Sequence, residues 1–386
     1  MSQSEDSMVP QIQFRGFEEQ WSQVKLGEVA NLINGRAYSQ DELLKSGFYK
    51  VLRVGNFYTN SSWYFSDMQL AEKYYANNGD LLYTWSASFG PHIWGGEKVI
   101  FHYHIWKIDL SERLVKEFAL QLLEKDKEKI LNNSNGSTMI HITKGGMEVK
   151  EFSIPSPEEQ TRIGSYFREL DQLIRQHLEK HDKLVALKQA MLQKIFPQAG
   201  TLIPEVRFKG FEGVWRKQLL QHLANRYDNL RVPVSASNRI SGTTPYYGAN
   251  GIQGYVCGYT HDGAFILVAE DGASDLKNYP VQFVNGKIWV NNHAHVLQAK
   301  EEVSDNLFLK YAFAQYNVEP FLVGGGRAKL NAEVMMQMEF MVPVEIAEQQ
   351  EIGQYFYKLD TLIARHATQL EKFKQVKAAC LEKMFV

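Results

Sequence analysis

Residues 163–196 read IGSYFRELDQLIRQHLEKHDKLVALKQAMLQKIF, and residues 352–385 read IGQYFYKLDTLIARHATQLEKFKQVKAACLEKMF. The two stretches align without a gap, 189 positions apart. Neither contains proline, each holds a single glycine near its start, and both are rich in Leu, Lys, Gln, Glu and Ala, so each predicts a long helix. Pro155 and Pro157 precede the first helix, Pro197 ends it, and Pro343 precedes the second.

In both stretches, positions that advance by alternating steps of four and three form one line along the helix, which we call the seam. The seam of the first helix holds Ile163, Phe167, Leu170, Ile174 and His177, followed by His181, Leu184, Lys188, Met191 and Ile195. The seam of the second holds Ile352, Phe356, Leu359, Ile363 and His366, followed by Leu370, Phe373, Lys377, Cys380 and Met384. This heptad spacing, present twice in one register, predicts that the two helices pack on each other as a coiled coil.

We expect the two seams to run antiparallel, because two similar halves are then related by an approximate two-fold axis. His177 and His181 should then lie within about two helical turns of His366 and Leu370. Although histidines four residues apart can bind a metal ion, no Cys or carboxylate joins them at ligand spacing, so we predict no metal site. The seam histidines are better interpreted as polar residues that set the register.

A second repeat lies outside the helices. FRGFEEQW at residues 14–21 returns as FKGFEGVW at residues 208–215, and about 130 dissimilar residues separate each phrase from its helix. This pattern predicts two half-molecules with variable middles. The domains expected are a disordered N-terminus (1–9), a first globular domain (10–154), a first helical spacer (155–197), a second globular domain (198–343) and a second helical spacer (344–386).

Composition supports two globular domains. The 386 residues are 44% hydrophobic and 12% aromatic, which is enough to fill more than one core. The formal net charge is −2, so binding to nucleic acid would have to rest on local clusters of charge. Two cysteines make no disulfide framework, and we find neither a secretory signal nor an apolar run long enough to span a bilayer. We therefore expect a cytoplasmic protein.

Both variable middles predict mixed α/β structure. Strand-like runs such as YKVLRV and DLLYTW in the first, and AFILVAED and HAHVLQA in the second, are separated by Gly-rich and Asn-rich turns. One helix is expected in each middle, at residues 112–132 and 305–316.

The doubled layout resembles the specificity subunit of Type I restriction-modification systems. The local stretches that carry the resemblance are YYGANGIQGY (246–255), ILVAEDGAS (266–274), WVNNHAHVL (289–297), GGGRAKLN (324–331) and PSPEEQTRIGSYFRELDQLI (155–174). The resemblance implies a mixed α/β fold in which two target recognition domains are separated by two long helices, packed as an antiparallel coiled coil, with a pseudo-two-fold internal repeat. It also implies that the two domains read the two halves of a bipartite, asymmetric double-stranded DNA target.

In that family the subunit is not itself an enzyme. The resemblance implies that its helices dock two methyltransferase subunits and, in the full complex, restriction subunits. S-adenosylmethionine, ATP and Mg are then expected on those partners, with no cofactor on this chain. In agreement, the sequence contains no GxxxxGK[ST] phosphate loop, no GxGxxG after a strand and no Asn-Pro-Pro-aromatic motif.

Residues that contact DNA are expected among polar and basic side chains in the loops of the middles, because such groups read base edges and phosphates. The candidates in the first domain are Arg36, Tyr38, Arg53, Ser86, Ser88 and Lys144. The candidates in the second are Asn250, Ser274, Lys277, Arg327 and Lys329.

Two other functions are compatible with the sequence. Asp262, Asp275 and Lys277 could form the carboxylate pair and lysine of a metal-dependent nuclease, although a turn rich in Asp and Gly explains them equally well. A scaffold that binds only proteins is the third possibility, because the bulk charge carries no nucleic-acid signature. Magnesium-dependent nicking by the isolated chain would favour the nuclease, and absence of DNA binding even with partners would favour the scaffold.

Overall fold

The computed structural model describes residues 9–86, 88–133, 142–324 and 328–386. The chain divides into two compact units, Met1–His177 with Gln369–Val386, and Leu178–Thr368. Residues 1–8 of the N-terminus predicted to be disordered lie outside the described residues. Within the described parts of the chain, no helix is both long enough and apolar enough to cross a membrane.

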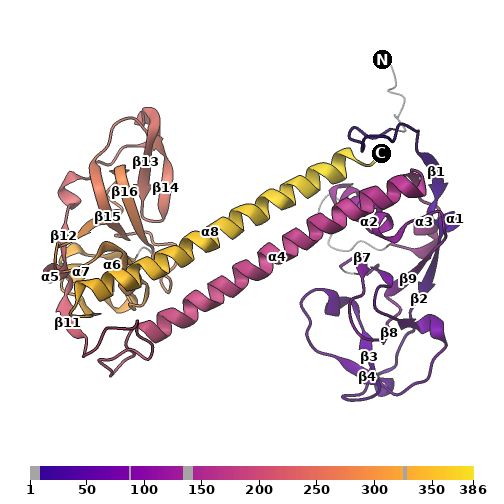
Figure 1. Ribbon diagram of the computed structural model, residues 1–386, viewed down its shortest axis with the longest axis horizontal. Helices are drawn as coiled ribbons and strands as arrows, with labels where there is room; N and C mark the ends of the chain where they lie inside the picture. Colours follow the sequence, from indigo (N-terminus) through magenta and orange to yellow (C-terminus); the bar gives the residue numbers. More distant parts are fainter. Residues whose placement is uncertain (1–8, 87, 134–141, 325–327) are drawn as a thin grey trace. The chain divides into compact units, whose positions relative to one another are not determined.

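The first unit carries two four-stranded sheets (Figure 1). One has the order β2-β9-β6-β7, formed by Ala30–Asn34, Ile105–Leu110, Leu81–Thr84 and Gly90–Ile93; the other has the order β4-β3-β8-β5, formed by Tyr64–Ser66, Tyr49–Leu52, Val99–Phe101 and Tyr75–Ala76. All neighbouring strands are antiparallel except β3 and β8, which are parallel. The remaining elements are β1 (Ser22–Lys25) paired with β10 (Glu151–Ile154), α1 (Leu26–Val29), α2 (Lys116–Asn133), α3 (Lys144–Glu148) and the 3-10 turns η1 (Gln40–Glu42), η2 (Val54–Phe57) and η3 (Glu72–Tyr74).

The second unit carries one six-stranded sheet of order β12-β17-β15-β16-β13-β14. Its strands are Ala224–Arg226, Ala294–Ala299, His261–Ala269, Val281–Val290, Ser241–Gly248 and Gly251–Val256, and only β13 and β16 pair in parallel. The other elements are β11 (Arg216–Leu219) paired with β20 (Glu339–Val342), β18 (Leu322–Val323) paired with β19 (Lys329–Leu330), α5 (Leu220–Leu223), α6 (Asn306–Ala314), α7 (Ala332–Met336), η4 (Asp228–Leu230), η5 (Ala236–Asn238) and η6 (Glu319–Phe321). The mixed α/β fold predicted for both middles is therefore confirmed.

The two repeated stretches form the long helices α4 (Pro157–Ile195) and α8 (Ile346–Lys383). In the first unit, Lys377 Nζ of α8 lies 2.6 Å from Asp171 Oδ1 of α4. In the second unit, Lys188 Nζ of α4 lies 2.5 Å from Asp360 Oδ1 of α8. Early residues of one helix thus meet late residues of the other in each unit, and the predicted antiparallel packing is confirmed.

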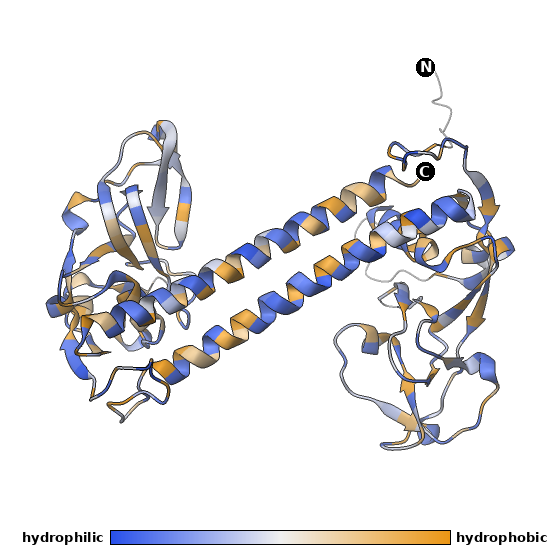
Figure 2. Ribbon diagram, in the orientation of Figure 1, coloured by the Kyte–Doolittle hydropathy of each residue, from blue (hydrophilic) through white to orange (hydrophobic). Residues whose placement is uncertain are grey.

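Burial along the helices follows the heptad spacing. All ten seam positions of each helix are buried or half-buried, and apolar residues recur between polar ones along both ribbons (Figure 2). Near the middle of α4, the His177 ring packs on Phe373 with ring centroids 5.4 Å apart, and His181 Nδ1 lies 3.0 Å from Asp182 Oδ1. These contacts with an aromatic ring and a neighbouring carboxylate are what polar residues on a helix pair are expected to make.

An aromatic cluster in each unit explains why the phrase ending in Trp occurs twice. In the first unit, Trp21 packs against Phe118 and Phe385, with ring centroids 5.8 and 6.1 Å apart, and Phe385 packs on Phe167. In the second unit the cluster consists of Trp215, Phe308, Phe196 and Phe356. Each tryptophan therefore closes the core where the end of one long helix meets the start of the other.

A buried amide repeats in the same way. Gln160 Nε2 donates to the carbonyls of Arg113 and Pro155, both at 2.9 Å, and its Oε1 accepts from the Val115 N–H at 2.8 Å. Gln349 makes the equivalent bonds in the second unit, to the Val303 and Pro343 carbonyls and from the Asp305 N–H. Because a buried amide that loses its partners costs about 1–3 kcal/mol, these bonds fix each globular domain to its own long helix.

Candidate nucleic-acid interface

Four chain segments of the second domain meet beside the end of β15. Asn250, between β13 and β14, donates from Nδ2 to the Gly272 carbonyl at 2.9 Å and accepts from the Ser274 N–H at 2.8 Å. The Glu270 carbonyl accepts from the Leu330 N–H at 2.7 Å, and the Glu270 N–H donates to the His293 carbonyl at 2.9 Å. Two of the predicted DNA-contacting residues, Asn250 and Ser274, are thereby joined directly, and both are exposed.

Lys277 and Lys329 belong to two of the same chain segments. The Lys277 N–H donates to Asp275 Oδ1 at 2.8 Å, and its side chain is exposed in the segment that follows Ser274. Lys329 lies in β19, where its Nζ binds Glu270 Oε1 at 2.8 Å while its side chain remains 45% exposed. Arg327, the remaining candidate of this domain, lies outside the described residues.

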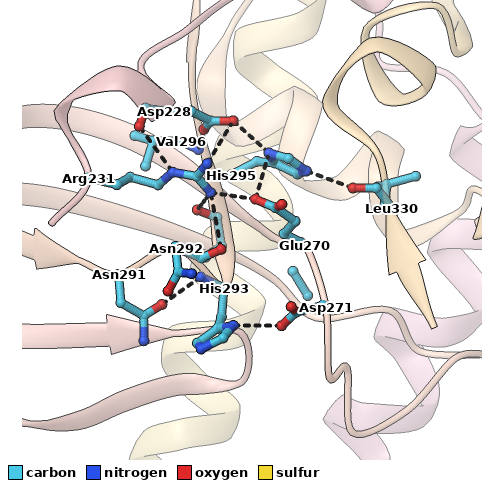
Figure 3. Close-up of polar contacts among 12 residues, drawn as sticks. Asp228, Arg231, Glu270, Asp271, Asn291, Asn292, His293, His295, Val296 and Leu330 are labelled. Atoms are coloured by element: carbon cyan, nitrogen blue, oxygen red, sulfur yellow. Dashed lines mark hydrogen bonds and ion pairs between the residues drawn. The ribbon is translucent and has the colours of Figure 1, made fainter. Parts of the chain in front are cut away.

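Beneath these loops lies a set of charged side chains that we call the Glu270 network: Asp228, Arg231, Glu270 and His295 (Figure 3). Arg231 Nη1 donates to Glu270 Oε2 at 2.6 Å and to the Ala294 carbonyl at 2.9 Å. Asp228 Oδ2 lies 2.7 Å from His295 Nδ1, and its Oδ1 accepts from the Val296 N–H at 2.8 Å. All four side chains are at most 15% exposed.

The partners of His295 determine how the network is held together. Its Nε2 lies 2.8 Å from the Leu330 carbonyl oxygen, and its Nδ1 faces the Asp228 carboxylate. Both partners are acceptors, so the ring satisfies both contacts only when both of its nitrogens carry protons. His295 then ties the Asp228 turn to the β19 segment.

The electrostatics of the two carboxylates agree with this geometry. Burial by itself would raise the pKa of Asp228, but His295, the Val296 N–H and Arg231 outweigh burial and lower it. Burial likewise opposes ionisation of Glu270, and Lys329, Arg231 and His295 outweigh it and lower the pKa of Glu270. Both groups are therefore carboxylates at neutral pH, and their charge is balanced by neighbouring cations.

A metal ion could in principle use the same donors, because one ligand atom each from Asp228, Glu270 and His295 lies within 4.8 Å of the others. However, Arg231 and Lys329 already occupy the Glu270 carboxylate at 2.6 and 2.8 Å. A cation entering this set would have to displace both of them. The donors therefore fit an internal ion network better than a metal centre.

A second histidine contact extends the network toward the loops. His293 Nδ1 lies 2.6 Å from Asp271 Oδ1, and the His293 N–H donates to Asn291 Oδ1 at 2.8 Å (Figure 3). Asp271 directly follows Glu270, and Asn291 is 4% exposed. The turn between β16 and β17 is thus bound to the loop after β15.

In the first domain, three of the predicted residues are engaged within the protein. Arg36 donates to Glu42 through Nη1 at 3.1 Å and Nη2 at 2.6 Å, a bond that raises the pKa of Arg36 and lowers that of Glu42 to about 2. Tyr38 stacks on His102, and burial raises the pKa of its phenol. The Arg53 guanidinium lies over the Tyr64 ring, 4.2 Å from its centroid. DNA contact at these residues stays a prediction.

The other candidates of the first domain lie in two separate segments. Ser86, half-buried, and Ser88, exposed, follow β6. Lys144 is the first residue of α3, with its Nζ 3.5 Å from Glu148 Oε1. Among the residues that the structure describes, no hydrogen bond or ion pair joins these three, so the described part of the first domain offers no counterpart of the Asn250–Ser274 pair.

The residues of the Glu270 network were not identified from the sequence. They are spread over 68 positions, from Asp228 to His295, with no ligand or charge spacing that would group them. The strand pairing of β15 with β17 brings Glu270 and His295 together, since Ala269 pairs with Ala294. The only local signals were a carboxylate directly after an apolar run and a histidine inside one.

The structure does not bring Asp262 and Asp275, the carboxylates of the nuclease interpretation, together at one site. Asp262 pairs with Lys287 near the start of β15, whereas Asp275 lies in the loop beyond the end of that strand. The Asp275 carboxylate accepts from the N–H groups of Lys277 and Asn278 and from the Asn278 side chain. These bonds are those of a loop-closing aspartate, which also lower its pKa.

Comparison with known proteins defines the class. Residues 18–189 and 216–375 each match the family described as Type I restriction modification DNA specificity domain. The two matches cover most of the chain, one in each half-molecule. The chain therefore belongs to this family, as its doubled layout indicated.

Individual relatives carry related names. The chain is 46% identical over 139 residues to a Haemophilus influenzae protein named as a type I restriction enzyme specificity subunit, S.HindORF215P, an alignment that covers 36% of this chain and 35% of that protein. It is 27% identical over 189 residues to the type I restriction enzyme MjaVIII specificity subunit of Methanocaldococcus jannaschii, covering 46% and 42%. These alignments therefore span less than half of either relative.

A solved structure shows the same fold over the whole chain. The S subunit of the Type-I restriction-modification system from M. genitalium superposes with a TM-score of 0.76, covering 98% of this chain and 99% of that one. The sequence identity is 15%, so this similarity concerns the fold. It confirms the architecture of two α/β domains and two long helices.

Proposed function

We propose that this chain is the DNA-recognition subunit of a Type I restriction-modification complex. Each of its two domains reads one half of a bipartite, asymmetric double-stranded DNA target. Family membership of both half-molecules supports this proposal, and the relatives named above carry the names of specificity subunits.

The observation that carries the proposal is that both domains join their long helices in the same way, whereas the sheets of the two domains differ. Both units use a Trp and three Phe, a buried Gln and a two-stranded β pair to join domain to helix. The sheets mounted on these joints differ, with two four-stranded sheets in the first unit and one six-stranded sheet in the second. One scaffold that presents two different surfaces suits a target with two different halves.

The repeated helices support a role in assembly. Asp171 with Lys377 and Lys188 with Asp360 are the same ion pair in the two halves, at 2.6 and 2.5 Å. Because each half presents equivalent helical segments, we propose that two methyltransferase subunits bind per chain and that restriction subunits join in the full complex. S-adenosylmethionine, ATP and Mg are assigned to these partners, and this chain carries no catalysis of its own.

The test is to purify the chain with its methyltransferase partner and select bound duplexes from a random DNA library. Native mass spectrometry should give two partner copies per chain, and the selected DNA should contain two different half-sites at a fixed spacing. The isolated chain should neither methylate nor nick DNA with Mg present. A complex that assembles but selects no sequence would favour the scaffold, and nicking by the isolated chain would favour the nuclease.

A further inference from the structure

We propose that the Glu270 network positions the DNA-reading loops of the second domain and so sets the specificity of one half-site, although its own side chains are at most 15% exposed. This inference rests on the proposed function. Asp228, Arg231, Glu270 and His295 are positioning residues, and the groups they place are Asn250, Ser274 and Lys329.

The first support is that the network ties together segments that are distant in the sequence. Arg231 binds Glu270 and the Ala294 carbonyl, while His295 bridges Asp228 and the Leu330 carbonyl. These contacts join the η4 turn, the end of β15, the start of β17 and the β19 segment. A loop held at several points by charged hydrogen bonds keeps its geometry better than one held at its ends.

The second support is the short path from the network to the exposed groups. Glu270 is held through its carboxylate and through both of its backbone polar groups, which bond to Leu330 and His293. Only Asp271 separates it from Gly272, whose carbonyl accepts from Asn250. A shift of Glu270 is therefore passed within two residues to the Asn250–Ser274 pair.

The third support is the position of Lys329 at the boundary of the network. Its ammonium binds a Glu270 oxygen at 2.8 Å, yet 45% of its side chain is exposed. While Glu270 holds it, the lysine is directed to one place. Without the carboxylate, Lys329 loses its ion pair with Glu270 and can turn to any phosphate, which favours DNA binding without sequence preference.

In the first domain, Trp85 occupies the backbone position that Glu270 occupies in the second. Thr84 of β6 pairs with Ile105 of β9 as Ala269 of β15 pairs with Ala294 of β17. The next residue in each case, Trp85 or Glu270, donates its N–H to the carbonyl of His104 or His293, at 3.1 and 2.9 Å.

At this shared position an aromatic stack replaces the ion network. Trp106 occupies the position of His295 in the pairing and stacks between Tyr83 and Trp85, with both centroid distances 5.8 Å. The loop that follows Trp85 contains Ser86 and Ser88, as the loop that follows Glu270 contains Ser274. The two half-sites should therefore respond to different substitutions.

The test uses the full chain in its methyltransferase complex and measures methylation rates on the cognate duplex and on duplexes with one mismatched base pair in either half-site. Glu270→Gln should lower the ratio of cognate to mismatched methylation rates about tenfold for mismatches in one half-site, which is within the range of effects that a single mismatched base pair has. For mismatches in the other half-site, the ratio should stay within about twofold of wild type. Trp85→Leu should relax the opposite half-site. Glu301→Gln, at an exposed glutamate beyond the far end of β17, is the matched control and should change neither.

A second readout separates positioning from a purely structural role. Glu270→Gln should bind a duplex without any target at least as tightly as wild type does, because it removes the ion pair that holds Lys329. Lower binding to all DNA, equal relaxation of both half-sites, or unchanged discrimination in a complex that assembles normally would each overturn the proposal. Failure of the proposed function would be visible beforehand, as a wild-type complex with no bipartite target.

Discussion

Two helical glycines provide a test of how each domain is fixed to its helix. A Cβ added to Gly164 of α4 would lie 2.7 Å from the Glu117 Cβ and 2.8 Å from the Phe118 backbone nitrogen. A Cβ added to Gly353 of α8 would lie 2.8 Å from the Phe308 nitrogen. Both neighbours belong to the first turns of α2 and α6, so backbone would have to move to make room.

The sign of the stability change shows which of two opposing contributions, helix propensity or overpacking, is larger. Replacing a helix-interior glycine by alanine ordinarily stabilises by about 1 kcal/mol through helix propensity. Overpacking against backbone costs about 1–3 kcal/mol and occasionally more. Because the added carbon lies well inside the ordinary contact distance of about 3.5–4.0 Å, we expect Gly164→Ala and Gly353→Ala to be net destabilising by about 1–2 kcal/mol. For units of this size that corresponds to a fall in Tm of roughly 2–8 °C.

Hydrogen exchange followed by mass spectrometry measures the effect locally. Gly164→Ala should speed exchange at the start of α2 only, and Gly353→Ala at the start of α6 only. Gly145→Ala is the control, since a Cβ there meets nothing within 4 Å, and it should be neutral or stabilising. If Gly164→Ala and Gly353→Ala raise the Tm as the control does, the close packing of α4 and α8 on the domains is refuted.

Four further predictions concern the long helices. In a urea titration, Glu348→Gln should destabilise the second unit by about 3–5 kcal/mol, because it leaves Arg207 without the buried carboxylate whose two oxygens it binds at 2.7 Å. Glu159 occupies the equivalent position in the first unit, where Gln13 stands in place of the arginine. In the same titration Glu159→Gln should be neutral or stabilising, because burial raises the pKa of Glu159. Burial would raise the pKa of Asp360, but Lys188 and Lys310 outweigh it and lower that pKa. The ionised form of Asp360 therefore contributes stability above pH about 4, and this stability is lost as the pH falls through the lowered pKa that Asp360 has in the folded protein. Asp360→Asn should flatten the acid limb of a plot of urea midpoint against pH. Inserting one heptad at the middle of both α4 and α8 adds about 10.5 Å to each helix, and mapping of methylated sites should show the unread spacer of the target longer by roughly two to four base pairs; an unchanged spacer in an active variant would contradict this.

The helices were the part of the fold most accessible from sequence. The seam repeats every seven residues in both copies, and periodicity of this length depends only on local spacing. The antiparallel orientation followed from the repeat itself. The tryptophan of the repeated phrase, in contrast, gave no indication that it would close a cluster with Phe118, Phe167 and Phe385, because those residues come from three distant segments.

Candidate interface residues were harder to choose from sequence. In the sequence, Arg36 and Arg53 look like exposed loop cations. Only the tertiary structure places Glu42 beside Arg36 and the Tyr64 ring beneath Arg53. Asn250 and Ser274, which are 24 positions apart, were proposed separately, and the hydrogen bond between them depends on how the β13–β14 hairpin meets the loop after β15. Strand register decides such contacts, and turn residues alone do not encode it.

The most direct test of the central claim is genome-wide mapping of N6-methyladenine in cells that carry this chain with its methyltransferase partner, compared with cells that carry the partner alone. We predict one additional methylated motif that requires this chain, made of two different half-sites separated by a constant unread spacer. A palindromic or uninterrupted motif, or the same methylation pattern without this chain, would contradict the account.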